Sequence, residues 1–213
     1  MKTFKNALLI DLQYIPSINW ILNSIQYKNI KILLSDDSQK MSFRNKCYVV
    51  GSNGLINLSI PLKGGRDKKQ KVKDVKINND YKWQLLHWKT IQSCYKKAAY
   101  FEYFEHVFQP FYQNHFEYLF DYNYKMISKI FIFCKLDINI KLEESKIIMD
   151  ENEFCDLRNS ITPKNYLNTE YYKYKQAFEE KIGFFPNVSC IDLLMNDGLN
   201  FIKEIPFSKA SKQ

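Results

Sequence analysis

The chain has 213 residues, of which 46% are hydrophobic and 16% aromatic, so it can bury a core and is not a disordered chain. Its formal charge is +8, but Arg44, Arg66 and Arg158 are the only arginines, and dispersed lysines without an arginine-rich face argue against nucleic-acid binding. We expect a single domain over residues 1–204 and a frayed C-terminal tail at 205–213.

Five cysteines are scattered along the chain, without a CxxC motif or a histidine at zinc-ligand spacing. An odd number without a disulfide-like pattern predicts free thiols in a reducing compartment, and no metal site. The N-terminal apolar run is too short for a signal peptide, and no stretch reaches the roughly 20 residues that span a bilayer. We therefore expect a cytoplasmic protein without membrane insertion.

The N-terminal region predicts a strand, a helix and a second strand. The apolar run at 7–12 reads as a buried strand, the spacing of apolar residues at 18–27 as a helix, and the run at 30–34 as another strand. This order is the outline of a βαβ unit. The turn that carries Gln13 then follows the carboxyl end of a strand, where open α/β sheets usually bind ligands.

Two further apolar runs, 46–50 and 55–61, flank Gly51-Ser-Asn-Gly54. An Asn-Gly pair between strands is typical of a type I′ hairpin turn. The lysine-rich segment at 63–73 has two interpretations: a solvated loop, or a lid that contacts phosphate when an anionic ligand binds. A short strand is expected to resume at Val72, Val75 and Ile77.

The middle of the chain predicts three helices, at 81–96, 101–120 and 121–136. The first has an apolar face formed by Trp83, Leu86, Thr90, Ile91 and Cys94. The other two have a stripe typical of a core, formed by Phe104, Phe108, Phe111, Phe116, Leu119, Ile127, Ile130, Phe131 and Cys134. The predicted fold class is α/β: a small mixed sheet from the N-terminal βαβ unit and the hairpin, packed with several helices.

Common catalytic and cofactor motifs are absent from the sequence, including GxGxxG, GxxxxGK[ST], GxSxG and HExxH. The sequence therefore identifies no cofactor. Of the three histidines, His87 stands out because it lies between Leu86 and Trp88 in a predicted helix. It is either a buried structural histidine or an acid–base group that titrates near neutral pH.

Several polar residues lie at the predicted ends of strands and helices. Arg44 has a planar guanidinium suited to phosphate or carboxylate. Ser42 and Asn45 also have a structural interpretation, as residues that form turns. Asp156 and Arg158 likewise have one, as a surface ion pair. At the end of the chain, Ser189 is expected to cap the last helix, with Asp192 three residues further on.

Four segments together resemble the WbqC-like protein family. They are DLQYIPSINWI, SFRNKCYVVGSNGLINLSIPLKG, WQLLHWKTIQSCYKKAAYFEYF and YKYKQAFEEKIGFFPNVSCIDLLMNDG. The chain departs from the family pattern at Ala99, where proline is usual, and in a shorter stretch at 150–170. The resemblance implies a cytoplasmic bacterial protein with relatives encoded among genes for O-antigen and other surface polysaccharides.

The resemblance suggests a transferase that modifies a nucleotide-linked sugar, by acyl or aminoacyl transfer. In this hypothesis His87 and Tyr95 are the catalytic acid–base candidates. The expected substrate-binding residues are Gln13, Ser42, Arg44, Asn45, Lys89, Asn187 and Ser189.

A sharper hypothesis puts six of these residues around one pocket: Gln13, Arg44, Asn45, His87, Lys89 and Asn187. There Arg44 and Lys89 would hold an anionic group of a phosphorylated or nucleotide-linked small molecule. The alternative is that the residues cap helices and satisfy turns independently. A second functional hypothesis is a non-catalytic binding or scaffold subunit of a glycan-assembly pathway. The sequence identifies no protein partner.

Overall fold

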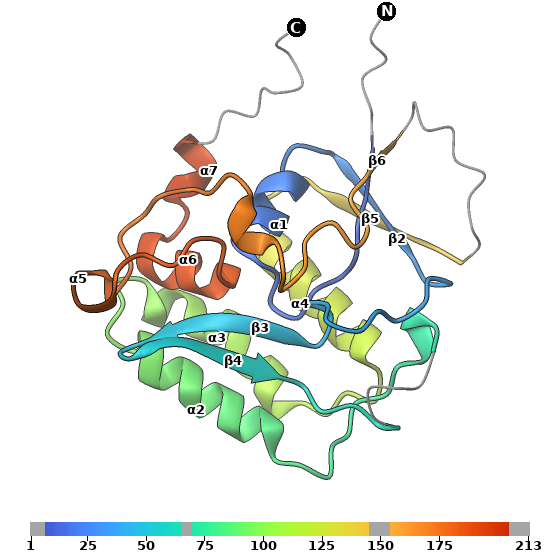
Figure 1. Cartoon of the computed structure of the whole chain (residues 1–213), viewed down its shortest axis with the longest axis horizontal. Coiled ribbons are helices and arrows are strands. Elements are labelled where there is room, and N and C mark those ends of the chain that lie inside the picture. The colour runs from blue at the N-terminus through green and yellow to red at the C-terminus, as the bar shows by residue number, and fades with distance from the viewer. Residues whose placement is uncertain (1–6, 65–69, 145–153, 205–213) are drawn as a thin grey trace, which may run out of the picture.

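The computed structural model describes residues 7–64, 70–144 and 154–204 (Figure 1). These ranges contain seven α-helices, a four-stranded parallel sheet and a two-stranded antiparallel sheet, which confirms the predicted α/β class. The predicted strands do not join in one mixed sheet, because the hairpin forms a sheet of its own. The expected tail at 205–213 lies outside the described residues.

The parallel sheet has the strand order β5-β2-β1-β6. Its strands are β1 (Ala7–Leu9), β2 (Asn29–Leu33), β5 (Asn139–Glu143) and β6 (Phe154–Asp156), and all neighbouring pairs are parallel. β1 is buried throughout because it is apolar and lies between two other strands, whereas β5 is largely exposed at one edge.

Helix α1 (Ile18–Ser24) connects β1 to β2 and confirms the predicted βαβ unit. Its Trp20 ring stacks on Phe131, with ring centroids 6.1 Å apart. Trp20 also donates a hydrogen bond of 2.7 Å from Nε1 to the carbonyl of Asp11, just after β1. The helix is thereby fixed against Phe131 and against the loop that precedes it.

The hairpin consists of β3 (Lys46–Gly51) and β4 (Gly54–Ser59), with Gly51 paired to Gly54. The predicted type I′ turn is wrong, because such a turn needs positive φ at both central residues. Here the central residues are Ser52 and Asn53, and only the following Gly54 has positive φ, at +119°. The strands nevertheless pair one to one up to Gly51 and Gly54, and glycine adopts the positive φ at position 54 without steric cost.

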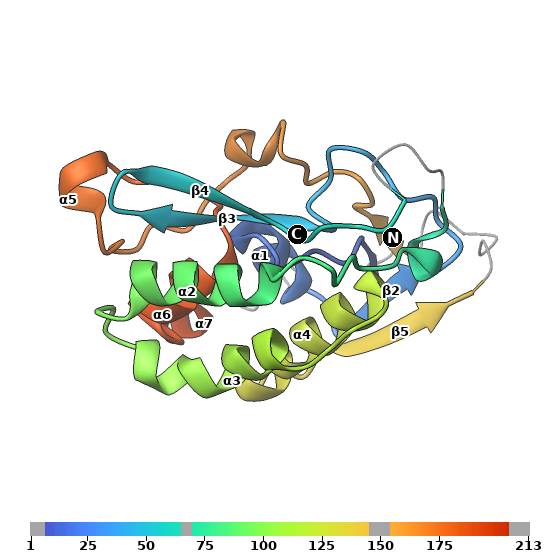
Figure 2. The ribbon, with the colours of Figure 1, turned by 90° about the horizontal axis from the view of Figure 1, so that it is seen from below.

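Three helices form layers beneath the hairpin (Figure 2). They are α2 (Trp83–Tyr95), α3 (Phe101–Gln113) and α4 (Leu119–Phe133). The predicted helix over 101–120 ends early, because Asn114 turns extended and its Nδ2 donates 2.7 Å to the Pro110 carbonyl. The predicted stripe on α3 and α4 is in the core.

The predicted apolar face of α2 is wrong at one position. Leu86 is 63% exposed, whereas His87 is buried, and the buried stripe continues through Ile91 and Tyr95. These three are spaced four residues apart and share one side of the helix.

After the hairpin, the chain forms a 3₁₀ helix, η1 (Val72–Asp74), where a strand was predicted. Val75 and Ile77 are nevertheless buried, and Ile77 makes an isolated bridge with Leu62. Residues 65–69 of the lysine-rich segment, including Arg66, lie outside the described residues.

The C-terminal part contains the 3₁₀ helix η2 (Tyr166–Asn168) and helices α5 (Glu179–Ile182), α6 (Cys190–Asp197) and α7 (Asn200–Glu204). Ser189 precedes α6, but the expected side-chain cap is not formed, because its hydroxyl donates 3.1 Å to the Ile15 carbonyl. All five cysteines are free thiols, as predicted.

Candidate functional site

The loops that follow β1, β2 and β6 meet at the carboxyl edge of the parallel sheet. Each has a charged residue shortly after its strand ends: Asp11 after β1, Asp36 after β2, and Arg158 after β6. The chain leaves β1 toward β2 on one side, while β6 lies on the other side. Open α/β sheets bind ligands where the connections diverge in this way.

A largely buried ion pair joins two of these segments. Asp11 Oδ1 accepts a hydrogen bond from Arg44 Nη2, and the two side chains are only 14% and 7% exposed. Asp11 Oδ2 accepts from the backbone N–H of Asn159, at 2.6 Å. One carboxylate thus holds the β1 loop, the β6 loop and the segment before β3 together.

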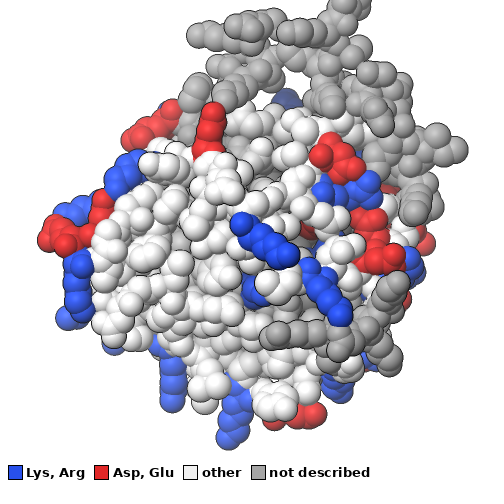
Figure 3. Space-filling view, viewed as in Figure 1, with Lys and Arg blue, Asp and Glu red and all other residues white. Residues whose placement is uncertain are grey.

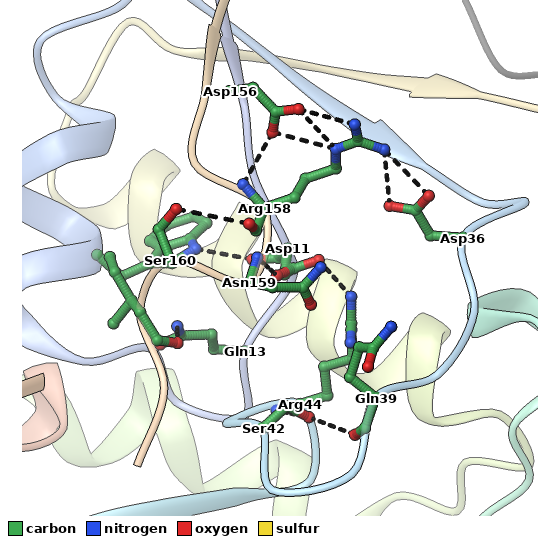
Figure 4. Close-up of polar contacts among 12 residues, drawn as sticks. Asp11, Gln13, Asp36, Gln39, Ser42, Arg44, Asp156, Arg158, Asn159 and Ser160 are labelled. Carbon is green, nitrogen blue, oxygen red and sulfur yellow. Dashed lines mark hydrogen bonds and ion pairs between the residues drawn. The ribbon is translucent and has the colours of Figure 1, made fainter. Parts of the chain in front are cut away.

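Arg158 is held between two carboxylates (Figure 4). It donates from Nη2 to Asp156 Oδ2 at 2.7 Å and from Nη1 to both oxygens of Asp36 at 3.1 and 3.2 Å. Partial burial raises the pKa of Asp156, but hydrogen bonds from the Arg158 side chain and backbone outweigh it and lower the pKa overall. Asp156 is therefore ionised at neutral pH.

A cavity of about 290 Å³ opens beside this cluster. It is lined by Ser35, Asp36, Asp37, Gln39, Lys71, Asp156, Arg158 and Asn159. The lining is almost entirely polar, so it suits a polar ligand held by hydrogen bonds. Within the described residues, no group of histidine, cysteine and carboxylate side chains has the arrangement of a metal site.

A second, much smaller cavity of about 10 Å³ is lined in part by Arg44. Arg44 Nη1 and Asn123 Oδ1, which belong to residues lining it, are buried and have no hydrogen-bond partner among the described residues. A buried donor and a buried acceptor without partners are rare in folded proteins. The volume suits about one water molecule rather than a substrate.

The two predicted catalytic residues lie in the core instead. His87 Nδ1 forms a hydrogen bond of 2.8 Å with the Tyr14 hydroxyl, and burial lowers the pKa of His87 to about 4. The Tyr95 hydroxyl donates 2.8 Å to Asp192 Oδ1 and accepts 3.0 Å from the Val50 N–H, and burial raises its pKa. The Tyr95 hydroxyl thus both donates and accepts within the core, whereas the His87 ring has its recorded partner at Nδ1.

Gln13 and Ser189 hold the first turn in place. Gln13 Oε1 accepts hydrogen bonds of 3.0 Å from the backbone and the hydroxyl of Ser17. Ser189 bonds to Ile15, as described above, and both residues are about 2% exposed. These contacts are those of structural residues.

The remaining predicted residues are spread over the molecule. Ser42 donates 3.1 Å to the Gln39 carbonyl, and Asn45 donates 3.0 Å to the Ile60 carbonyl. Lys89 lies exposed on α2. Asn187 is buried with a φ of +53°, and its amide bonds to the carbonyl of Tyr166 and the hydroxyl of Thr169.

Of the predicted residues, only Arg44 takes part in the polar cluster at the sheet edge. None of the nine lines the 290 Å³ cavity. The hypothesis that six of them share another pocket stays a prediction. The residues that sequence reasoning missed are Asp11, Asp36 and Asn159. The predicted ion pair of Asp156 and Arg158 is confirmed, but its contact with Asp36 at the cavity was not foreseen. A signal was present, since Asp11 interrupts the apolar run at 7–12 and Asp36 lies two residues after the run at 30–34.

The fold and site define an α/β protein with a polar cavity at the carboxyl edge of a parallel sheet. The model of the WbqC-like protein family matches residues 13–168, which is most of the chain, so the protein belongs to the WbqC-like family. No curated protein and no solved structure matches the chain. Among the helices of the described ranges, none has the length and apolar character needed to cross a bilayer.

Proposed function

We propose that this protein binds a nucleotide-linked sugar at the carboxyl edge of its parallel sheet and modifies it by acyl or aminoacyl transfer, in surface-polysaccharide biosynthesis. The observation that carries the binding site is the convergence of the charged loops after β2 and β6 on one cavity, with the β1 loop tied to them by the hydrogen bond from the Asn159 N–H to Asp11. The family resemblance supports the biosynthetic setting.

The polar groups of the cavity suit the hydroxyl-bearing part of such a ligand. Arg44 Nη1 has no partner among the described residues, but it is buried beside the 10 Å³ cavity, where it suits a water molecule rather than a phosphate. The carboxylates and amides of the cavity can bond to hydroxyl groups. His87 and Tyr95 remain the predicted acid–base groups, but a ligand would have to displace their internal partners.

Thermal-shift measurements test the binding site. We expect at least one of UDP-glucose, UDP-N-acetylglucosamine and dTDP-glucose to stabilise the protein, by about 2.7 kcal/mol when the free ligand is at 100 times its dissociation constant. Arg158→Gln should remove the shift, because it disrupts the cluster that positions the cavity carboxylates. Lys141→Gln, on the exposed strand β5, is the matched control and should keep it. If none of the three ligands shifts the wild-type protein, this proposal is wrong.

A non-catalytic binding subunit is the second candidate, and one observation favours it. The cavity lining contains no histidine, cysteine or tyrosine, and the two predicted acid–base residues bond to other groups. The protein is incubated with a nucleotide-sugar and a small-molecule extract of cells, which serves as the source of the donor. Mass spectrometry of the nucleotide-sugar then distinguishes a transferase from a non-catalytic binding subunit. Covalent modification supports the transferase, whereas binding without modification supports the subunit.

A further inference from the structure

We infer that the 290 Å³ cavity receives an uncharged, hydroxyl-rich ring of the monosaccharide class, and not a phosphate group. This inference rests on the proposed function, since it assigns the sugar part of the ligand to this cavity. It is carried by the way the charged groups of the lining are already paired with one another.

Both cations of the lining are neutralised by its own carboxylates. Arg158 donates from all three side-chain nitrogens to Asp156 and Asp36. Lys71 Nζ lies 2.7 Å from Asp37 Oδ1. Among its described residues, the lining has three carboxylates against two cations, a formal charge of −1, so a phosphate would meet repulsion and no unpaired cation in this part of the chain. Figure 3 shows acidic and basic side chains intermingled, rather than separated, on the right of the face that it displays.

The same lining matches the chemistry of sugar hydroxyls, which donate and accept at once. The aspartate oxygens have acceptor capacity beyond their bonds to the cations, since each carboxylate can accept about four hydrogen bonds. Gln39 and Asn159 each bring a side-chain amide, which both donates and accepts. The Ser35 hydroxyl is buried and has no partner among the described residues.

The geometry of the lining is fixed by the sheet. Asp36 and Asn159 belong to loops that leave strands on either side of β1, and the backbone of Asn159 is tied to Asp11. Asn159 has a φ of +56°, which asparagine tolerates better than most residues. The volume lies at the lower end of the roughly 300–1,000 Å³ of small-molecule sites, so it fits a single ring rather than a complete nucleotide-sugar.

NMR titration of the full chain tests this assignment at the cavity itself. The side-chain amide signals of Gln39 and Asn159 report on the lining, and that of exposed Gln113 on α3 is the internal reference. The probes are D-glucose, D-galactose, N-acetyl-D-glucosamine and inorganic phosphate, at constant ionic strength. We expect at least one sugar to shift the two cavity amides with roughly millimolar affinity, while phosphate leaves them unchanged.

Two variants sharpen the test. Asn159→Gly keeps the positive φ but removes the side-chain amide. The sugar affinity measured from the shift of the Gln39 amide should therefore weaken about tenfold. Asp36→Asn removes one of the two carboxylates that hold Arg158, so phosphate should now shift the cavity amides. Lys141→Gln, on the exposed strand β5 and outside the cavity lining, should leave both titrations unchanged.

The inference is overturned if phosphate shifts the cavity amides of the wild-type protein, or if none of the sugars does. A nucleotide-sugar that stabilises the protein without shifting these amides would leave the proposed function intact and refute this assignment alone. If Asp36→Asn gains no response to phosphate, charge pairing does not govern selectivity and the inference fails.

Discussion

His87 is enclosed by aromatic side chains. Its ring stacks on Tyr14 with centroids 5.7 Å apart and meets the edge of Trp83 at 5.3 Å. The Tyr14 hydroxyl also bonds to Tyr112 at 3.0 Å, so the imidazole belongs to a continuous buried network. Because burial penalises the charged form, His87 is neutral at physiological pH and its ring contributes packing and one hydrogen bond.

This environment predicts a pH dependence of stability. The pKa of His87 falls from 6.5 in the unfolded chain to about 4 in the folded protein, so the unfolded chain binds more protons between these values. The stabilisation is complete above pH 6.5 and is lost as the pH falls toward 4. Between pH 7.5 and 4.5 the wild-type free energy of unfolding should fall by about 2–3 kcal/mol more than that of His87→Gln.

Urea unfolding of both proteins at the two pH values measures this difference. The comparison with the variant cancels the other titrating groups, which both proteins share. Equal losses of stability in the two proteins would show that His87 is accessible to protons in the folded state.

Helices α5 and α6 both end at glycines, and the two ends differ in their surroundings. Gly198 after α6 has a φ of +68°, and a Cβ there would lie 2.8 Å from Tyr100 Cε1. Gly183 after α5 has a φ of +79°, but a Cβ there would have no described atom within 4 Å. The backbone requires glycine at both positions, whereas the tertiary contact exists at only one.

Alanine substitutions should separate these two effects. Gly183→Ala should cost about 1–3 kcal/mol from backbone strain alone. Gly198→Ala should cost more, because the Tyr100 ring must also move. Chemical denaturation of both variants measures the difference, and equal costs would mean that the ring yields freely.

Helix α6 is anchored by a buried carboxylate. Asp192 accepts hydrogen bonds from Tyr95 on α2, from Tyr174, and from Gln176 Nε2 at 2.9 Å. Burial raises the pKa of Asp192, against the hydrogen bonds, which lower it. The network ties the C-terminal segments to the centre of the molecule, so that these segments are part of one folded unit.

For the whole molecule, this means that the core extends beyond the family match, which ends at residue 168. Ile191, Leu194 and Met195 are at most 2% exposed. A chain that ends at residue 182 should therefore lack a cooperative unfolding transition. Circular dichroism with urea unfolding provides the measurement, and a cooperative, native-like truncated protein would contradict the expectation.

A milder substitution checks the same point without removing the segment. Leu194→Ala should cost about 2–5 kcal/mol, as for a buried leucine. Leu167→Ala, at a site that is 50% exposed, is the matched control and should change stability by less than about 0.5 kcal/mol.

The sequence by itself determined the βαβ unit, the hairpin and the three central helices. Their periodicity and turn residues are local, so they can be read from neighbouring positions. It did not reveal β5 or β6. The sequence of β5 alternates polar and apolar residues, but over five residues only, and β6 has only three residues, so the pairing with distant strands is what defines both.

The site was decided by the tertiary structure. Asp11, Asp36 and Arg158 are far apart in sequence, and they meet because β6 inserts beside β1 on the side opposite β2. No local pattern specifies that pairing. Burial is equally non-local: the sequence places His87 on a helix, but only the packing of Tyr14 and Trp83 around it makes the imidazole neutral. Local periodicity therefore predicts elements, whereas charge pairing and desolvation depend on which elements the fold brings together.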